Sequence, residues 1–431
     1  MKTAFLKIAI LLFFPLMSFA QKDIGQFSHE LASKWFQLEV EMVPNTEGFT
    51  PPVTARVFGY SGLTLYESMV HGSTKYKSLV GTINDFEKMP KPSSGKTYNW
   101  MVVANTAQAE IVRLLFANAN DKYTNEIDQL ESTLNKKYTA TSSSDELKRS
   151  QKFGKDIANA IFDYSKSDGG HEAYKHNFPK DFKLAPGSCM WVPVGQQKAL
   201  QPYWGENRTF VKGNADFDMP PPPRCEIGNS SILYVQALEV YSVSKNLNEE
   251  QKAIAEFWSD DPGKTFTPPG HGVSIANQLV INEDLPFDKA AEVYCRVGMA
   301  AHDAFISCWK CKYKYNLLRP VTFIQTSIDP SWKAYLENPP FPEYTSGHGT
   351  VSGAIAIVLS DMFGYNYSFT DHSHEKNGLK PRTFESFLHY ANEAALSRLY
   401  GGIHYRMSNE KGLENGKRVG RAVCDIKMSK S

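Results

Sequence analysis

The segments KYKYNLLRP (residues 312–320), EYTSGHG (343–349) and SRLYGGIH (397–404) follow one another in the second half of the chain. Arginine carries a rigid fork of donors that suits the oxygens of a tetrahedral anion, and lysine adds a point charge. We therefore expect the three segments to form a cage for a small oxyanion. Its members, the anion cage from here on, are Lys312, Arg319, Ser346, Gly347, His348, Arg398 and His404.

The apolar run HGTVSGAIAIVLSDMF predicts a helix that starts directly after Ser346 and Gly347. A helix N-terminus presents free N–H groups and a partial positive charge to an anion. Gly401 and Gly402 end the preceding helical pattern, so Arg398 and His404 can turn toward one anion.

Proline disfavours helical geometry in the residue before it. The helix that carries Lys312 near its end therefore cannot simply continue through Arg319 and Pro320, and we expect Arg319 at the margin of a loop.

Helical periodicity dominates the chain, and no segment up to residue 167 alternates convincingly with period two. About ten helices and no credible sheet predict an all-α protein. Residues 168–230 are an irregular, proline- and glycine-rich connection. We expect a signal peptide over 1–20, an N-terminal helical region over 21–230 that includes this connection, and a C-terminal helical bundle with the anion site over 231–431. Among the expected elements are helices over 383–400 and from about 410 to 427, and a loop over 257–271.

The spacing of the cage residues resembles the signature shared by vanadium-dependent haloperoxidases and type-2 phosphatidic acid phosphatases. The chain departs from it at Thr345, where Pro is usual, and at Ser408, where Asp is usual four residues after the last His. The block spacing, the residues HYR after Ile403 and the ring of Phe341 look most like secreted bacterial iodoperoxidases.

This resemblance implies helical bundles, in the form of two packed four-helix bundles, and vanadate as cofactor. His404 would bind vanadium, and the other cage residues would hold the vanadate oxygens. The resemblance makes His348 the acid/base that deprotonates hydrogen peroxide and makes Lys312 the residue that polarises it, so His348, Lys312 and His404 are the expected catalytic residues. The expected substrates are hydrogen peroxide and a halide, with iodide favoured, and the organic acceptor is left open. Phe341 and Trp309 are assigned to a substrate pocket, with core packing as the alternative for Phe341.

A secreted acid phosphatase is the alternative, with phosphate in the same cage, His404 as nucleophile and His348 as the acid for the leaving group. A nucleophilic imidazole benefits from a carboxylate partner, which Ser408 cannot supply, so the sequence favours the haloperoxidase. A non-enzymatic oxyanion-binding protein is a third, weaker possibility.

Composition fits a globular protein, with 42% hydrophobic and 22% charged residues among 431. The formal net charge of +1 argues against a nucleic-acid partner or a charged membrane surface. The first twenty residues combine Lys2 and Lys7, an apolar stretch and a small residue at Ala20, which predicts export with cleavage near that residue. An oxidising compartment permits disulfides among the six cysteines.

Some further groups carry weaker predictions. The cysteines of CWKC (308–311) are expected to be buried or locally paired and not catalytic. Trp258, Asp260 and His271 are expected mainly as surface loop residues, with the rim of the site as the alternative. His302 with Asp303 is a possible pair behind the cage. The remaining histidines, expected to have no role in the site, are His29, His71, His171, His176, His372, His374 and His389.

Overall fold

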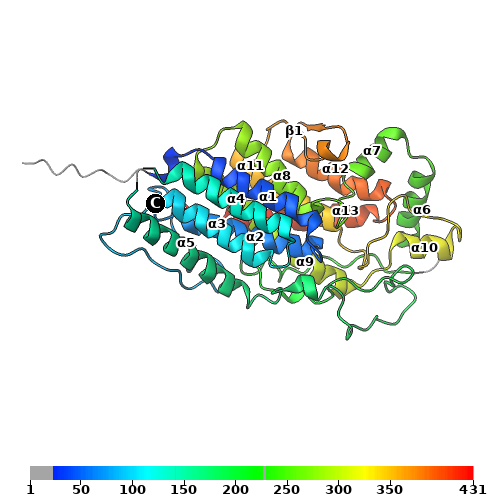
Figure 1. Cartoon of the computed structure of the whole chain (residues 1–431). Coiled ribbons are helices and arrows are strands. Elements are labelled where there is room, and N and C mark those ends of the chain that lie inside the picture. The colour runs from blue at the N-terminus through cyan, green and yellow to red at the C-terminus, as the bar shows by residue number, and fades with distance from the viewer. Residues whose placement is uncertain (1–22, 141, 227–229, 431) are drawn as a thin grey trace, which may run out of the picture.

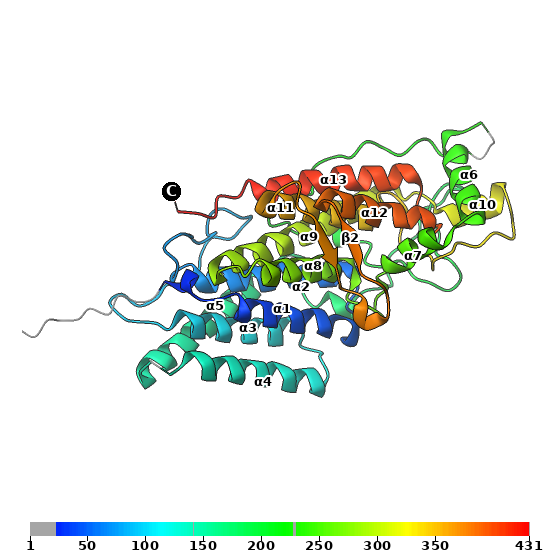
Figure 2. The ribbon, with the colours of Figure 1, turned by 90° about the horizontal axis from the view of Figure 1, so that it is seen from above.

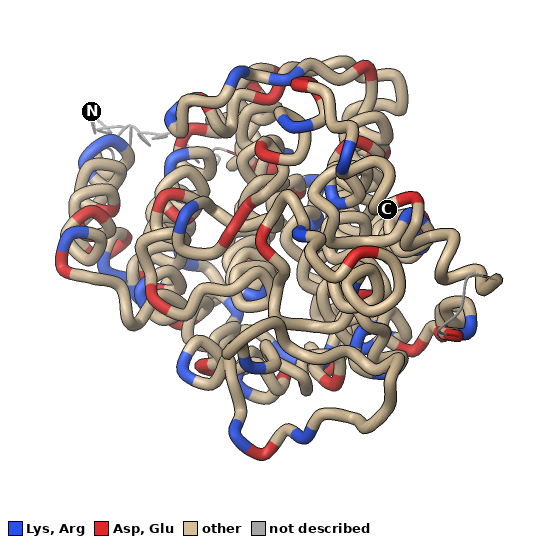
Figure 3. Tube along the Cα trace, turned by 90° about the vertical axis from the view of Figure 1, so that its right-hand side faces the viewer, with Lys and Arg blue, Asp and Glu red and all other residues tan. Residues whose placement is uncertain are grey.

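The structure is a computed structural model that describes residues 23–140, 142–226 and 230–430. The expected signal peptide lies outside the described residues. Thirteen α-helices and one small sheet make up the regular structure in these ranges, which confirms the all-α prediction. Within the same ranges, no helix is long and apolar enough to cross a membrane. Figure 3 shows cationic and anionic residues interspersed along the chain, as a net charge near zero predicts.

Five helices of the first half of the chain run alongside one another (Figures 1 and 2). The second helix is buried along its whole length, and the outer ones bury one face each. These helices are α1 (Glu30–Met42), α2 (Pro51–Met69), α3 (Trp100–Leu115), α4 (Asp121–Tyr138) and α5 (Ser144–Ser165), with short 3-10 turns η1 (Ile24–Gln26) and η2 (Val43–Asn45) beside α1.

The second half contributes a group of long helices and three shorter ones that gather at one end of the molecule (Figure 1). The long helices are α8 (Thr267–Asn282), α9 (Phe287–Tyr315), α11 (Gly347–Phe363), α12 (Phe387–Tyr400) and α13 (Arg406–Cys424). The shorter ones are α6 (Ile232–Lys245), α7 (Glu249–Phe257) and α10 (Pro320–Ser327).

Helices from the two halves pack closely against each other. A Cβ on Gly62 of α2 would lie 2.6 Å from the carbonyl oxygen of Tyr294 on α9, so only glycine allows this approach. The rings of Phe36 on α1 and Tyr294 stack with centroids 4.0 Å apart. One cluster of buried apolar side chains continues through both halves. The packing therefore does not separate the two halves, and the boundary between them at residue 230 stays a prediction.

A two-stranded antiparallel sheet contradicts the expectation that the chain holds no sheet. Strands β1 (Phe369–Asp371) and β2 (Arg382–Phe384) pair between α11 and α12, with the 3-10 turn η5 (Glu375–Asn377) between them. Three residues per strand are too few to produce a visible alternation in the sequence. The expected helix over 383–400 accordingly starts only at Phe387, and the last helix starts at Arg406, four residues before the predicted Glu410.

The connection over residues 168–230 is irregular, as predicted, with only the 3-10 turns η3 (Ala173–Lys175) and η4 (Trp204–Glu206) among its described residues. A disulfide joins Cys189 to Cys225. The backbone beside Cys189 hydrogen-bonds to residues 316–318, so the connection lies against the chain that links Lys312 to Arg319. The free cysteines are Cys295, Cys308, Cys311 and Cys424, of which the first three are buried.

Candidate active site

Lys312 and Arg319 reach the site from two consecutive elements. Lys312 lies in the last turn of α9, which ends where Asn316 adopts a left-handed conformation with φ 46°. Arg319 is the N-cap residue of α10, and Pro320 follows at the first helical position, where a missing N–H costs nothing. Sequence analysis placed Arg319 at a loop margin. The structure places it between two elements, as expected, but with its side chain buried.

Ser346 caps α11, since its hydroxyl accepts a hydrogen bond from the N–H of Gly349 at 3.3 Å. Gly347 and His348 open the helix and line the cavity. Helix α13 lies so close that a Cβ on Gly412 would come within 2.7 Å of the Ser346 carbonyl oxygen. The absence of a side chain at Gly412 thus allows α13 to pack directly against the start of α11.

Arg398 and His404 stand on either side of a tight turn. The N–H groups of Ile403 and His404 both donate to the carbonyl of Arg398, at 3.1 and 3.3 Å. Gly402 has a φ of 75°, which favours glycine and closes the turn. Arg319 Nη1 donates to the carbonyl of Ile403 at 2.8 Å, so this turn is bound to the first cage segment.

Several polar side-chain atoms of the anion cage are buried and have no hydrogen-bond partner within the described ranges. They are Arg319 Nη2, Arg398 Nε and the Nε2 atom of His348. Buried polar atoms are nearly always hydrogen-bonded in folded proteins, and leaving one without a partner costs roughly 1–3 kcal/mol. Three such atoms at one place indicate that the site binds a group rich in oxygen.

The charges of the site act strongly on its histidines. Burial lowers the pKa of His404 well below its usual value, and Arg319, Lys312 and Arg398 lower it further. Burial and the charge of Arg398 likewise lower the pKa of His348 well below its usual value. Burial also lowers the pKa of Lys312. Both imidazoles are therefore neutral at neutral pH, and each has a nitrogen lone pair available for a ligand or a proton.

A carboxylate that sequence analysis missed stands directly behind His404. Glu343 Oε1 lies 2.8 Å from His404 Nδ1, and Glu343 is fully buried. The hydroxyl of Ser408 donates to the other carboxylate oxygen at 2.8 Å. The argument that His404 lacks a carboxylate partner because of Ser408 was therefore wrong. The only sequence signal was the presence of Glu343 inside the segment EYTSGHG, 61 positions away from its partner.

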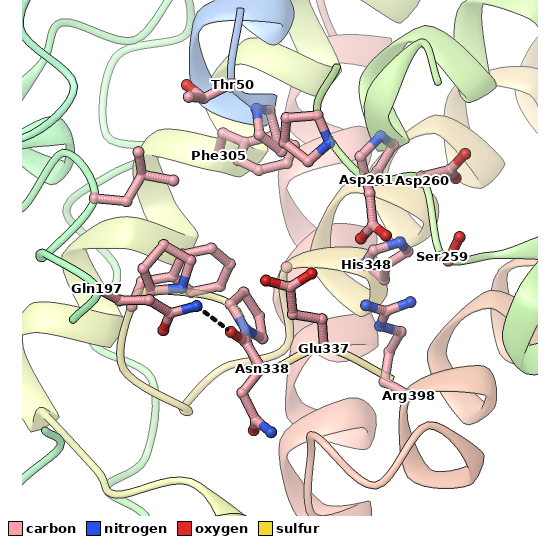
Figure 4. A pocket seen from close by; sticks show the side chains of 18 of the residues that line it. Thr50, Gln197, Ser259, Asp260, Asp261, Phe305, Glu337, Asn338, His348 and Arg398 are labelled. Carbon is pink, nitrogen blue, oxygen red and sulfur yellow. Dashed lines mark hydrogen bonds between the residues drawn. The ribbon is translucent and has the colours of Figure 1, made fainter. Parts of the chain in front are cut away.

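The cage opens into a cavity of about 300 Å³ with a mainly apolar wall (Figure 4). Phe341 and Trp309 both line it, with ring centroids 4.8 Å apart, and Lys312 Nζ lies 5.0 Å from the Phe341 ring. His348 and Arg398 face the cavity from the opposite side to Gln197 and Asn338 (Figure 4). Other wall residues are Thr50, Pro51, Leu200, Phe305, Pro339 and Pro340.

The segment around Trp258 lies against the cage and is not a surface loop. Arg398 Nη1 donates to the Trp258 carbonyl at 2.7 Å, and the backbone of Trp258 also hydrogen-bonds to His348. The expectation of surface exposure was wrong for Trp258, Asp260 and His271, which are all buried, and helix α8 already begins at Thr267.

A buried network of histidines and carboxylates fixes this segment. His271 Nδ1 lies 2.9 Å from Asp260, and its Nε2 lies 2.7 Å from Asp371. His374 Nε2 lies 3.2 Å from Asp260, and Asn377 contacts the other ring nitrogen of His374 at 2.9 Å. Asp260, His271 and His374 come close enough together to be considered as metal ligands, but their ring nitrogens already have hydrogen-bond partners. His374, for which no role was expected, belongs to this network.

The pair His302 and Asp303 lies elsewhere. Asp303 accepts hydrogen bonds from the N–H groups of Phe210 and Val211 and from Asn214, and His302 Nε2 contacts the Arg208 carbonyl at 3.2 Å. These contacts anchor the irregular connection to α9, and none of them is made to a cage residue.

Comparison with known proteins agrees with the signature. The family described as "VCPO second helical-bundle domain" matches residues 292–331 and 325–430. The vanadium chloroperoxidase of Curvularia inaequalis is 24% identical over 86% of this chain and 77% of its own length.

Solved structures extend the likeness to nearly the whole chain. The crystal structure of the first bacterial vanadium-dependent iodoperoxidase matches with a TM-score of 0.84 and 33% identity, over 94% of this chain and 98% of that one. A holo-type bacterial vanadium-dependent chloroperoxidase shares the fold, with a TM-score of 0.69 and 17% identity over 89% of this chain and 93% of its own. The chain belongs to the vanadium-dependent haloperoxidase superfamily.

Proposed function

We propose that this protein is a vanadium-dependent haloperoxidase that oxidises a halide, preferentially iodide, with hydrogen peroxide to a hypohalous-type species. The observation that supports it best is a pair of buried guanidinium donors without partners among the described residues, Arg319 Nη2 and Arg398 Nε, which lie beside the unpartnered Nε2 of His348. A tetrahedral oxyanion such as vanadate would supply acceptors for these donors and countercharge for the cations, so the residues present fit the group.

The residues that would hold vanadate follow from their chemistry. Nε2 of the neutral His404 would be the metal ligand, since Nδ1 faces Glu343. Lys312, Arg319 and Arg398 neutralise the oxygens, and Ser346 and Gly347 contribute donors at the start of α11. Bound vanadate supplies a Lewis acid that activates peroxide without a change of oxidation state.

His348 then has a separate task from the rest of the cage. Its imidazole is neutral because burial and Arg398 lower its pKa, so it can accept the first proton of hydrogen peroxide. Its Nε2 has no partner among the residues that the structure describes. Lys312 Nζ is held by the carbonyls of Pro342 and Glu343, and its charge would polarise peroxide bound at the site.

The preference for iodide is supported by a structural relative, by the chemistry of the halides and by two rings in the site. The structure that matches at 33% identity is an iodoperoxidase, and iodide is the most readily oxidised of chloride, bromide and iodide. Phe341 and Trp309 place apolar, polarisable rings beside Lys312, where a large, weakly hydrated anion loses little solvation. The organic acceptor that takes up the oxidised halogen is a small molecule of unassigned structure.

A secreted acid phosphatase is the second candidate, and one observation favours it. Glu343 gives His404 the carboxylate partner that a nucleophilic imidazole benefits from. The match to haloperoxidases over nearly the whole chain outweighs this single contact.

Export is proposed together with the activity. A disulfide between Cys189 and Cys225 supports an oxidising compartment, and the charged and apolar pattern of residues 1–20 supports a cleaved signal peptide. We assign the anion site to a C-terminal bundle over residues 231–431, preceded by a helical region over 21–230.

Reconstitution tests the function. Purified protein is freed of metal, incubated with orthovanadate, and assayed for peroxide-dependent oxidation of iodide, bromide and chloride. We expect activity only after vanadate is added, highest with iodide, and inhibition by phosphate competing for the same cage. Hydrolysis of a phosphomonoester without any response to vanadate would instead establish the phosphatase, and robust chloride oxidation would refute the preference for iodide.

A further inference from the structure

The carboxylate of Glu343 accepts its hydrogen bonds from a single short segment. Its Oε1 faces His404 Nδ1 at 2.8 Å and accepts from the N–H of Tyr405 at 3.0 Å. Its Oε2 accepts from the Ser408 hydroxyl at 2.8 Å. Both oxygens are therefore committed to residues 404–408, although Glu343 itself lies in the loop before α11.

The backbone of the same loop holds two of the cations. Lys312 Nζ donates to the carbonyls of Pro342 and Glu343, at 3.0 Å each. Arg319 Nε donates to the carbonyl of Phe341 at 2.9 Å. The segment 341–343 thus connects all three blocks of the anion cage, and the Glu343 side chain supplies its hydrogen bond with His404.

We propose that Glu343 is the positioning residue of His404, and that it replaces the Asp which the family signature usually carries at the place of Ser408. A carboxylate that accepts from Nδ1–H fixes the imidazole as the tautomer with its lone pair on Nε2 and sets the orientation of the ring. The Nε2 atom then faces the anion. This inference rests on the proposed function, because it takes vanadate as the group that Nε2 binds.

The position of Ser408 makes the inference testable by relocation. Its hydroxyl already lies 2.8 Å from the carboxylate, so an Asp at 408 would bring a carboxylate to the same space from the other side. In the double variant Glu343→Ala/Ser408→Asp, a carboxylate is again present beside His404, but the side chain of residue 343 no longer supplies it. A role for Glu343 in loop packing alone predicts no recovery in this variant.

The experiment measures binding and tautomer without turnover. Vanadate and inorganic phosphate affinities are determined by calorimetry for the wild type, Glu343→Ala, the double variant and Glu414→Ala, which removes an exposed carboxylate from α13 as a matched control. Nitrogen NMR of ¹⁵N-histidine-labelled protein reports the His404 tautomer. Removing an outer-shell partner of a metal ligand typically costs about 10–100-fold in affinity.

We expect Glu343→Ala to lose vanadate affinity by about that factor. The phosphate affinity should fall much less, because phosphate needs the cations and no imidazole lone pair. The Nδ1–H tautomer should disappear as the dominant form, and the double variant should regain both the vanadate affinity and the tautomer. Glu414→Ala should behave as the wild type.

Equal losses for vanadate and phosphate, or no recovery in the double variant, would overturn the proposal in favour of a structural role. If Glu343→Ala does not fold, Glu343→Leu supplies the same comparison, since its side chain fills the space and removes both acceptor oxygens. Binding is scored separately from halide oxidation. A protein that shows the vanadate effect but never oxidises halide would refute the proposed function and leave the role of Glu343 intact.

Discussion

At the scale of single residues, the side chains that supply positive charge to the site differ from the one that we propose exchanges a proton. Lys312, Arg319 and Arg398 are held by backbone carbonyls, so their positions do not depend on a bound anion. The Nε2 atom of His348 has no hydrogen-bond partner in the part of the chain that the structure describes, in keeping with a group that exchanges a proton. Removing His348 should therefore affect peroxide activation more than anion binding.

His348→Ala is expected to lower halide oxidation by about 10²–10⁴-fold, the usual contribution of a general base. The vanadate affinity should fall only moderately, because the cations and His404 remain. Since burial and Arg398 keep the pKa of His348 below its usual value, the wild type holds a neutral base across neutral pH. The deficit of the variant should be smallest at high pH, where more peroxide is already deprotonated.

Vanadate titrations and pH–rate profiles of both proteins check this expectation, with the exposed His176→Ala as control. A variant that loses vanadate binding while its residual activity keeps the wild-type pH profile would show that His348 is structural.

Charge type and spacing are local properties, so the sequence was enough to propose the seven cage residues, and their role in binding an anion stays a prediction. The Glu343 contact could not be predicted, because it pairs residues 61 positions apart that only the tertiary structure brings together. The signature even pointed to the wrong place for it, at Ser408.

At the scale of elements, the segment before α8 is fixed by an imidazole between two carboxylates. Burial alone would lower the pKa of His271, but Asp260 and Asp371 raise it to about 10. Asp371 lies at the end of β1, so the small sheet contributes directly to a network that supports His348 and Arg398. The sheet is therefore part of the support of the site.

This network predicts a pH-dependent contribution to stability. Because the pKa of His271 is raised from about 6.5 in an unfolded chain, its contribution is complete below pH 6.5 and is lost as the pH rises toward 10. His271→Gln should lower the free energy of unfolding by about 3–5 kcal/mol at pH 6, as expected when a buried ion pair is broken. The difference from the wild type should shrink steadily up to pH 10.

Denaturant unfolding across this pH range measures the effect, and His176→Gln provides an exposed histidine whose loss should change little. A difference between wild type and His271→Gln that stays constant with pH would mean that His271 is neutral in the folded protein.

The ends of helices could be predicted where a polar cap residue marks them, but not where tertiary contacts determine where the helix begins. The predicted helix after Ser346 begins at Gly347 because the serine hydroxyl caps it. By contrast, α8 begins at Thr267 with a φ of 62° before two prolines, a start that reads as loop in the sequence. Because the start of α8 at Thr267 was not predicted, the burial of His271 within this helix was not predicted either.

At the scale of the whole molecule, a disulfide closes one loop of the irregular connection, and this loop lies against the site. The disulfide between Cys189 and Cys225 closes 36 residues of sequence, and the chain inside it lines part of the cavity at Gln197 and Leu200. The sequence predicted the irregularity, but six cysteines allowed too many pairings for this one to be chosen.

Replacing both Cys189 and Cys225 by Ser should lower the free energy of unfolding by about 3–4 kcal/mol, as expected for a loop of this length. Calorimetric melting with and without a thiol reductant provides the check. Reductant should lower the Tm of the wild type and leave the double variant unchanged. A reductant effect of equal size in the double variant would assign the loss of stability to something other than this disulfide.

The burial of the two free thiols near the cavity, Cys308 and Cys311, has a bearing on the working lifetime of the protein. An oxidised halogen species reacts fastest with thiols and also oxidises indole rings, and it would be released within the cavity. Cys308 and Cys311 are shielded there, whereas Trp309 between them contributes to the cavity wall. The number of turnovers before inactivation should thus be limited by damage to Trp309, which mass spectrometry of peptides after prolonged turnover would locate.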